Sequence, residues 1–208
     1  MLTLPEGFRH FPHYLPLDEQ LAIVDEIRDV VAAAPLFLPV MPRSGQPMTV
    51  RMTNCGQLGW VTDKEKGYRY QQSHPDTGLR WPPIPNRILA LWRGLTGLNY
   101  EPEACLVNFY SDEARMGLHQ DKDEAEFSAP VLSISLGNSC LFRLGGLKRR
   151  DPTRSFRLDS GDIVLLGGPS RLFFHGVDRI YPDSSTLLKK GGRINLTLRR
   201  VTPAPASS

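Results

Sequence analysis

The chain has 208 residues, of which 40% are hydrophobic, and a formal net charge of +3. This length and apolar content suffice for one buried core. No run approaches the roughly 18 to 20 apolar residues of a membrane-spanning helix, and no apolar signal core follows the amino terminus. The three scattered cysteines, Cys55, Cys105 and Cys140, exclude a readable disulfide framework or zinc ribbon. We therefore expect a soluble, cytoplasmic monomer with no membrane partner.

Two helices are predicted in the first half of the chain. The first has Asp18 as its N-cap and an apolar stripe that lasts to about Ala34, and Pro35 ends it. The second runs from about Pro85 to Leu98, with its apolar residues on one side. Both patterns are typical of helices that pack on a core, so we expect no catalytic role for either.

The stretch from residue 35 to residue 85 is rich in proline, glycine and polar residues and mixes aromatic side chains with cations. The aromatic members are Trp60, Tyr68, Tyr70 and Trp81, and the cations are Arg51, Lys64, Lys66, Arg69 and Arg80. One interpretation is a β-ribbon whose aromatics pack on the core. The other is a functional cover that stacks an unpaired base and holds its phosphates.

From Cys105 onward, short β segments separated by glycine-rich turns are typical of a sandwich or barrel. Strands are predicted at 106–110, 131–136, 140–144, 155–158, 162–166, 172–175 and 193–199. Seven short strands indicate a jelly-roll. On the first of them, Asn108 and Tyr110 share a face and can donate hydrogen bonds to a carboxylate in a pocket, unless that face points outward.

A histidine and an aspartate stand two residues apart in Leu118-His119-Gln120-Asp121. On an extended backbone these two side chains share a face and can bind one metal ion. His175, at the end of an apolar run, lies far enough downstream to return on a neighbouring strand. Two histidines and one carboxylate are what a non-haem Fe(II) oxygenase needs, so we predict that His119, Asp121 and His175 are its metal ligands.

The segment from Arg193 to Arg199 alternates strictly between polar and apolar residues, which predicts a strand. If its polar face turns inward, two guanidiniums are buried at several kcal/mol per ion unless anions meet them. The two arginines are roughly 20 Å apart along such a strand. This spacing suits two long side chains that reach toward the two ends of a small dicarboxylate.

Seven segments form a more specific combination than any one of them alone. They are Met52-Thr53-Asn54-Cys55-Gly56, Gly59-Trp60, Asn108-Phe109-Tyr110, the stretch from Leu118 to Glu124, the stretch from Gly145 to Arg149, the stretch from Ser170 to Gly176, and the stretch from Arg193 to Arg199. This combination resembles the AlkB group of Fe(II)- and 2-oxoglutarate-dependent dioxygenases, which directly repair alkylated nucleobases. It covers nearly the whole chain from Met52 to Arg199.

The resemblance implies roles for individual residues. It implies iron ligation by His119, Asp121 and His175 and contacts to 2-oxoglutarate from Asn108, Tyr110, Arg193, Asn195 and Arg199. Substrate contacts are implied for Trp60, Tyr68, Tyr70, Asp123 and Arg149. Leu166 stands where close relatives of this family carry a tryptophan near the oxygen path.

The resemblance also implies an α+β fold that is mainly β. We expect amino-terminal helices and a nucleotide-recognition lid at 1–104, a double-stranded β-helix (jelly-roll) core at 105–201 and a flexible tail at 202–208, all in one integrated domain. The implied reaction uses Fe(II), oxygen and 2-oxoglutarate, and releases succinate and formaldehyde. The implied substrate is 1-methyladenine or 3-methylcytosine in single-stranded DNA or flipped from a duplex, with RNA as an alternative.

Two basic clusters, Lys148-Arg149-Arg150 and Lys189-Lys190, are expected in turns that flank the strands of the mouth, where they can follow phosphates. Each can instead be a solvated turn. Three other functions stay open at this point: a cupin-like zinc or manganese hydrolase, a nucleic-acid-binding module with a vestigial metal site, and an oxygenase that modifies RNA or a protein side chain.

Overall fold

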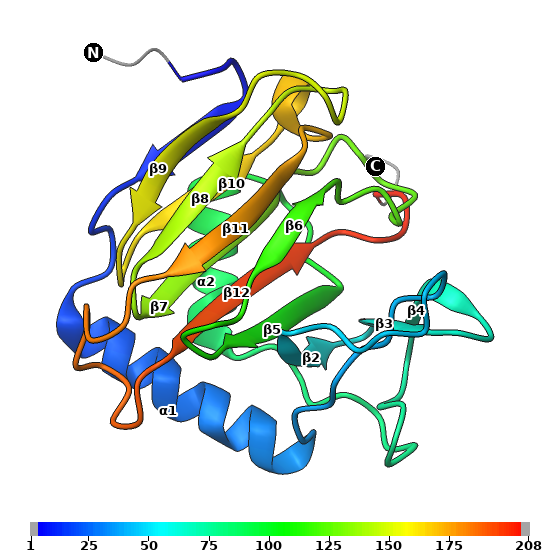
Figure 1. The fold of residues 1–208 in the computed structure, drawn as a ribbon. Helices are drawn as coiled ribbons and strands as arrows, with labels where there is room; N and C mark the ends of the chain where they lie inside the picture. The colour runs from blue at the N-terminus through cyan, green and yellow to red at the C-terminus, as the bar shows by residue number, and fades with distance from the viewer. Residues whose placement is uncertain (1–3, 205–208) are drawn as a thin grey trace.

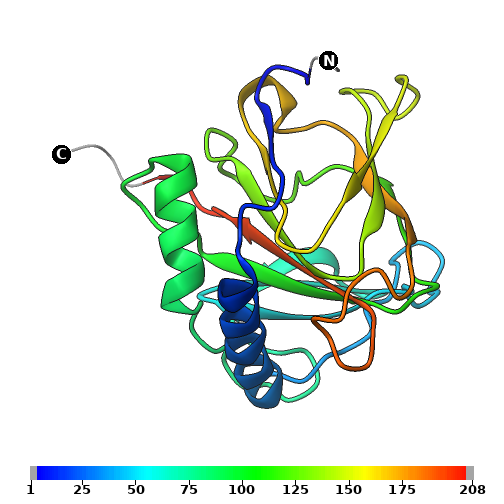
Figure 2. The same ribbon diagram turned by 90° about the vertical axis from the view of Figure 1, so that its left-hand side faces the viewer.

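The computed structural model describes residues 4–204 as two antiparallel sheets that face each other, with two helices behind the larger sheet (Figures 1 and 2). The last residues of the predicted tail, 205–208, lie outside the described part. The elements in chain order are β1 (Phe8–Phe11), α1 (Leu17–Ala33), β2 (Arg51–Gly56), β3 (Gly59–Asp63), β4 (Gly67–Gln71), α2 (Asn86–Thr96), β5 (Ala104–Tyr110), β6 (Met116–His119), β7 (Val131–Gly137), β8 (Cys140–Leu144), β9 (Arg154–Leu158), β10 (Ile163–Leu166), the 3-10 turn η1 (Gly168–Ser170), β11 (His175–Ile180) and β12 (Arg193–Arg199).

The larger sheet has six strands in the order β1-β10-β7-β12-β5-β2, and the smaller has four in the order β6-β11-β8-β9. This arrangement confirms the predicted double-stranded β-helix with two helices. Two strands of the larger sheet, β1 and β2, come from the first 104 residues, so the sheet runs across the expected boundary at residue 105.

Strand β12 lies in the middle of the larger sheet, paired with β5 on one side and β7 on the other. The predicted alternation is confirmed, because Leu196 and Leu198 belong to the core that also contains the apolar side chains of α1 and α2. The opposite face of β12 lines a cavity between the two sheets. One strand thus joins the main core to the polar interior.

Helices α1 and α2 cover the outer face of the larger sheet, as Figure 2 shows. The predicted N-cap of α1 was wrong: Pro16 caps the helix without a side-chain bond, and Asp18 lies in the first turn. There its charge still favours the helix amino terminus. Helix α2 ends at Thr96 and is capped by Gly97, whose φ of 68° is left-handed and suits glycine.

The expected strand at 172–175 was also wrong. Residues 171 and 172 form a turn, and the strand begins where it was expected to end, at His175. A bulge between Val177 and Arg179 interrupts the pairing of β11 with β8. Because a bulge breaks the two-residue period, the sequence of β11 does not show the alternation by which a strand is recognised.

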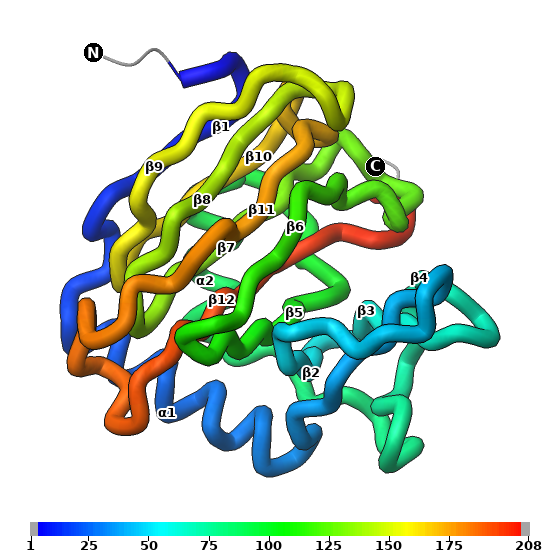
Figure 3. The backbone as a smooth tube through the Cα atoms, viewed as in Figure 1, coloured from blue at the N-terminus to red at the C-terminus, as the bar shows by residue number. Residues whose placement is uncertain are grey.

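The hairpin of β3 and β4 lies at the edge of the molecule near β2 and β5 (Figure 3). The aromatic residues of the stretch from residue 35 to residue 85 lie in two different surroundings. Trp81 is buried against Phe37 and His74 and is structural. Trp60 and Tyr68, by contrast, line the cavity between the sheets.

No helix within residues 4–204 is long and apolar enough to cross a membrane. All three cysteines are buried free thiols. Near the carboxyl end, Thr202 bonds to Glu103 and the backbone of Ala204 bonds to Glu126. The chain is therefore still attached to the body of the protein at residue 204.

Asp162 fastens β1 to the turn before β10. Its carboxylate contacts His10 Nε2 at 2.9 Å and accepts the backbone N–H of His13 at 2.7 Å. Burial alone would raise the pKa of this carboxyl, but these hydrogen bonds hold the pKa below its usual value.

We expect the substitution Asp162→Asn to lower the free energy of unfolding by about 1–3 kcal/mol at pH 7, because a buried charge-assisted bond is lost. A carboxyl with a lowered folded-state pKa stabilises the fold above its unfolded pKa, near 3.9, and loses that effect as the pH falls further. The difference in free energy of unfolding between wild type and variant should therefore become smaller below about pH 4. Urea unfolding at pH 7 and pH 3 measures this difference. Equal stability of the two proteins at pH 7 would contradict the stabilising role of the Asp162 carboxylate.

Candidate metal centre and co-substrate cavity

A cavity of about 460 Å³ opens between the two sheets. Its apolar wall comes mainly from methionine, valine, leucine and aromatic side chains of both sheets. Its polar wall comprises Asn108, Tyr110, His119, Gln120, Asp121, Lys122, Asp123, Ser133, Arg149, His175, Arg193, Asn195, Thr197 and Arg199, together with Arg43 from the segment before β2. Of the predicted site residues, only Tyr70 is missing from the lining.

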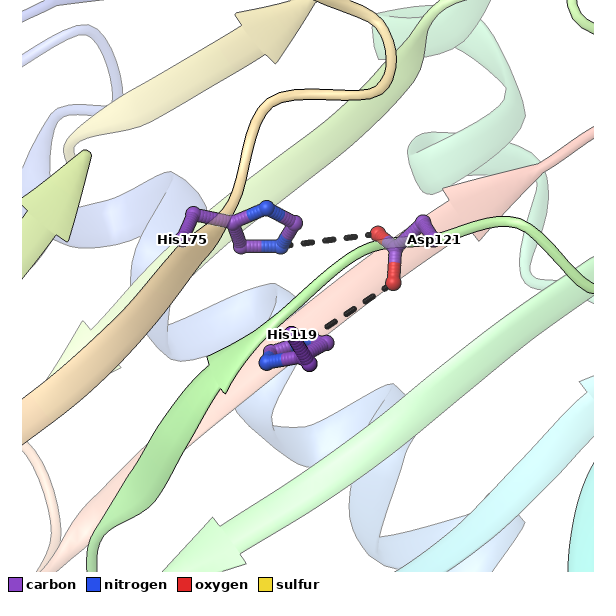
Figure 4. Close-up of side chains that lie close together, drawn as sticks. All are labelled: His119, Asp121 and His175. Atoms are coloured by element: carbon purple, nitrogen blue, oxygen red, sulfur yellow. Dashed lines mark ion pairs between the residues drawn. The ribbon is translucent and has the colours of Figure 1, made fainter. Parts of the chain in front are cut away.

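Three of these side chains converge, as Figure 4 shows. His119 Nε2 lies 3.7 Å from Asp121 Oδ1, and His175 Nε2 lies 3.6 Å from Asp121 Oδ2. One ligand atom from each residue falls within 4.8 Å of the other two. The predicted triad is therefore assembled with two nitrogens and one oxygen directed at one point, which fits Fe(II).

The pairing of β6 with β11 brings the two histidines together, because His119 and His175 are register partners. Gly176 permits this close approach. A Cβ at Gly176 would lie only 2.6 Å from the carbonyl oxygen of Met116. Asp121 follows two residues after β6 ends, in an irregular segment, so its position needs other support.

Each imidazole is oriented by a backbone carbonyl. His119 Nδ1 lies 2.9 Å from the oxygen of Gly117, and His175 Nδ1 lies 3.0 Å from that of Phe173. These contacts place the proton on Nδ1 and leave the Nε2 lone pair free for a metal. Burial, together with the neighbouring His119, lowers the pKa of His175 to about 4, so this ligand is neutral at pH 7.

Arg199 holds Asp121 in place. Its Nη2 donates to Asp121 Oδ1 at 2.6 Å, and its Nη1 donates to Glu124 Oε1 at 3.0 Å. Burial alone would raise the pKa of the Asp121 carboxyl, but the Arg199 charge holds the pKa well below its usual value. Asp121 is thus ionised and fixed, as a metal ligand must be.

Arg193 is 1% exposed and lies at the other end of β12. Its Nη2 donates to Ser135 Oγ at 3.0 Å, and its guanidinium lies 5.2 Å from the ring centroid of Tyr110. Within the described chain its Nε and Nη1 have no hydrogen-bond partner. A buried guanidinium with two free donors is costly unless an anion completes it.

Other buried atoms on the cavity wall also lack partners in the described chain: Asn108 Oδ1, Asp121 Oδ2 and Arg199 Nε. The free oxygen of Asp121 suits a metal, and the free arginine nitrogens suit a carboxylate. Burial raises the pKa of Tyr110 to about 12, so its hydroxyl keeps its proton and can donate. Asn195, in contrast, already bonds to Ser133 and Thr197, which makes it a brace within the wall.

The predicted substrate residues gather at the open side of the cavity. Trp60 and Tyr68 stack with ring centroids 5.6 Å apart, and Trp60 Nε1 donates to Asp123 Oδ2 at 2.8 Å. Arg149 lies over the ring of Phe174 and donates to the carbonyl of Leu118 at 2.8 Å. These four predicted residues therefore occur in one place.

One expectation needs correction. The hydroxyl of Tyr70 does not face the cavity; it bonds to Glu124 and Arg199 behind the wall. The cluster Lys189-Lys190 lies in a turn that flanks β12, as expected. It is at the Arg193 end of that strand, whereas the triad contacts Arg199 at the other end.

Comparison with known proteins agrees with this geometry. The model of the 2OG-Fe(II) oxygenase superfamily matches residues 7–199. The alpha-ketoglutarate-dependent dioxygenase AlkB homolog of Caulobacter vibrioides (strain NA1000 / CB15N) is 52% identical over 98% of this chain and 91% of its own length. The alpha-ketoglutarate-dependent dioxygenase AlkB of Escherichia coli (strain K12) is 42% identical over 86% of this chain and 83% of its own length. The chain belongs to the AlkB family.

A solved structure shares the fold of this AlkB-family protein. That of OsALKBH1 superimposes with a TM-score of 0.81 and 29% identity, covering 96% of this chain and 100% of the other. Two further relatives have names that state a reaction. The DNA N(6)-methyladenine demethylase ALKBH1C of Arabidopsis thaliana is 33% identical over 90% of this chain and 47% of its own length. The tRNA demethylase abh1 of Schizosaccharomyces pombe is 30% identical over 76% of this chain and 58% of its own length.

Family membership and geometry together make the protein an Fe(II)- and 2-oxoglutarate-dependent dioxygenase. The triad fits Fe(II), and the unpaired nitrogens of Arg193 fit a carboxylate of 2-oxoglutarate. The hydrolase alternative is set aside, because a hydrolase would have no use for the two buried arginines at the ends of β12.

Sequence reasoning missed two charged residues behind the site. Arg171 is buried and donates to the backbone oxygen of Asp121 at 2.7 Å and to Glu124 Oε2 at 3.2 Å. Glu124 in turn receives Arg199 and Tyr70. Both residues lie in segments that carry the family resemblance. That location is the feature of the sequence by which they could have been found.

Leu166 lines the cavity wall on β10 and is 2% exposed.

We expect Arg193→Gln to raise the KM for 2-oxoglutarate by about two orders of magnitude, because truncating a buried charged partner of an anion costs 2–5 kcal/mol. Succinate formation at varied 2-oxoglutarate measures it. Lys190→Gln, an exposed cation at the same end of β12, is the control and should leave KM unchanged. An unaltered KM in Arg193→Gln would show that the co-substrate binds elsewhere.

Proposed function

We propose that this dioxygenase demethylates N-alkylated nucleobases such as 1-methyladenine and 3-methylcytosine in DNA. The observation that carries the proposal is the grouping of Trp60, Tyr68 and Asp123 at the open side of the metal cavity. Aromatic faces stack an unpaired base, and a carboxylate favours a positively charged methylated one. The names of the Arabidopsis thaliana and Schizosaccharomyces pombe relatives support demethylation of nucleic acid.

In this mechanism the protein binds and orients three reactants. Bound Fe(II) supplies the redox chemistry, in which oxygen and 2-oxoglutarate give succinate and carbon dioxide while one oxygen atom enters a C–H bond of the methyl group. Arg193 and Tyr110 would hold the co-substrate, and Arg199 keeps Asp121 ionised. The hydroxymethyl group on the cationic ring nitrogen then leaves as formaldehyde: the C–N electron pair returns to the nitrogen, which becomes neutral, and the hydroxyl proton is released to solvent.

The target base must leave its stack to enter the cavity, because the triad lies between two sheets. Single-stranded DNA meets this condition at no unpairing cost, and a duplex meets it by base flipping. Trp60 and His119 would hold the two faces of the base. Three of the cations that line the cavity, Arg43, Lys122 and Arg149, would meet the phosphates of the strand.

RNA is the second candidate, supported by the tRNA demethylase among the relatives. Stacking on Trp60 tolerates either sugar, so matched DNA and RNA oligonucleotides must be compared directly. Higher kcat/KM on the RNA would move the assignment to RNA.

The decisive assay measures formaldehyde release from an oligonucleotide that contains 3-methylcytosine, with and without Fe(II) and 2-oxoglutarate. We expect release only with both, and a fall of at least about a hundredfold in His119→Ala, because even residues that merely support a metal ligand matter 10–100-fold. Release without 2-oxoglutarate, or full activity in His119→Ala, would refute the proposal. Sound DNA binding without turnover would instead indicate a non-catalytic binding module.

We expect Asp123→Ala to slow repair of the cationic lesions 1-methyladenine and 3-methylcytosine about tenfold more than repair of neutral lesions, because a charge-assisted contact is lost only with the cations. Parallel kcat/KM measurements on cationic and neutral methylated oligonucleotides test this. Equal slowing of both would remove the base-recognition role of Asp123.

A further inference from the structure

The β3–β4 hairpin is tied to the metal-ligand segment by two neighbouring hydrogen bonds. Trp60 and Tyr70 are direct cross-strand partners in the hairpin. Trp60 Nε1 donates to Asp123 Oδ2 at 2.8 Å, and the hydroxyl of Tyr70 donates to Glu124 Oε1 at 2.5 Å. One aromatic pair therefore meets two consecutive carboxylates.

The two carboxylates differ in their surroundings. The Glu124 side chain is fully buried and also accepts hydrogen bonds from the guanidinium groups of Arg171 and Arg199. Asp123 is exposed at the cavity mouth, and in the described part of the chain its hydrogen bond comes from the Trp60 indole. Glu124 is thus fixed without the hairpin, whereas Asp123 depends on the indole for its orientation.

The indole is itself held on two sides. Its backbone is fixed by Asn54, which accepts the N–H of Trp60 at 3.1 Å and donates to its carbonyl at 3.0 Å. Tyr68 stacks on its ring with an interplanar angle of 21°. A donor fixed in this way can orient an exposed carboxylate. With the indole bonded to Oδ2, Oδ1 is the oxygen of Asp123 that has no hydrogen-bond donor in the described chain.

An ionised carboxylate can only accept hydrogen bonds. Beside its methylated nitrogen, 3-methylcytosine carries an amino group that donates, while 3-methyluracil carries an oxygen that cannot. A correctly oriented Oδ1 would therefore favour the first base and repel the second.

We propose that Trp60 is a positioning residue for base selection. Its indole N–H orients Asp123 so that Oδ1 receives the amino group adjacent to the methylated ring nitrogen. This inference rests on the proposed function and deepens it, because it gives Trp60 a role in selectivity that is separate from stacking.

The test compares kcat/KM for 3-methylcytosine and 3-methyluracil in the same DNA oligonucleotide. Trp60→Phe keeps an aromatic face but removes the N–H donor. Weaker stacking should slow both substrates, and the cationic 3-methylcytosine somewhat more, in any Asp123 background. Loss of orientation should lower the cytosine-to-uracil ratio by a further factor of about three to ten, and only while Asp123 is present. A ratio equal to that of the wild type would overturn the proposal.

A double-mutant cycle shows whether Trp60 acts through Asp123. In an Asp123→Asn background, Trp60→Phe should cause only the smaller fall in the ratio that weaker stacking produces, because the oriented carboxylate is already gone. A further fall by the same factor would mean that Trp60 selects bases independently, which overturns the inference.

Tyr70→Phe is the matched control, because it removes the neighbouring bond from the same hairpin to Glu124. We expect it to leave the cytosine-to-uracil ratio unchanged even if overall turnover falls. An equal loss of selectivity in Tyr70→Phe would show that the hairpin as a whole, and not the indole N–H, sets the ratio.

The hydrogen bond between Trp60 and Asp123 can also be measured without substrate, even if Trp60→Phe fails to fold. The chain has three tryptophans, so the ¹⁵N-labelled protein should give three indole N–H resonances. Asp123→Asn should shift one of them, and in a folded Trp60→Phe variant that one should be absent. If Asp123→Asn moves none, the bond does not exist in solution and the inference fails, whatever the outcome of the formaldehyde assay.

Discussion

The bond between Arg199 and Asp121 supports the rest of the site. Two charges that are taken out of water are costly unless they are paired and hydrogen-bonded on every side. Here the pair is extended by Glu124 and Arg171 into a buried cluster of two cations and two anions. Because Asp121 follows the end of β6, this cluster, and not regular strand pairing, fixes the carboxylate that faces the two histidines.

The same cluster connects the parts of the fold that do different work. Arg199 comes from the central strand of the larger sheet, and His175 begins a strand of the smaller one. Tyr70 reaches the cluster from the hairpin that carries Trp60. The metal-ligand segment and the hairpin on the substrate side of the cavity therefore depend on one set of charges. Weakening any member removes a partner from a charge that stays buried.

Sequence patterns predicted those features that have a local period. The alternation of β12 identified its cavity face, and the two-residue spacing of His119 and Asp121 identified two of the three ligands. The position of strand β11 was mispredicted, because its bulge breaks the alternation of polar and apolar residues. Glu124 and Arg171 were missed for another reason: in a sequence a buried ion pair looks the same as two surface charges, and only tertiary contacts distinguish them. Residue chemistry alone likewise did not separate Trp60 from Trp81; the family resemblance singled out Trp60, and the fold places it at the cavity and Trp81 in the core.

The central position of β12 has a consequence for the choice of co-substrate. Hydrogen bonds to β5 and β7 on both edges prevent this strand from sliding or bending. The distance between Arg193 and Arg199 is consequently fixed. Arg193 lies beside Ser135, and Arg199 lies beside Asp121 of the triad. A diacid held at the triad by one end and at Arg193 by the other would have to match a length that the backbone of β12 sets. Homologous acids one carbon shorter or longer should be poor substitutes, however well either end binds alone.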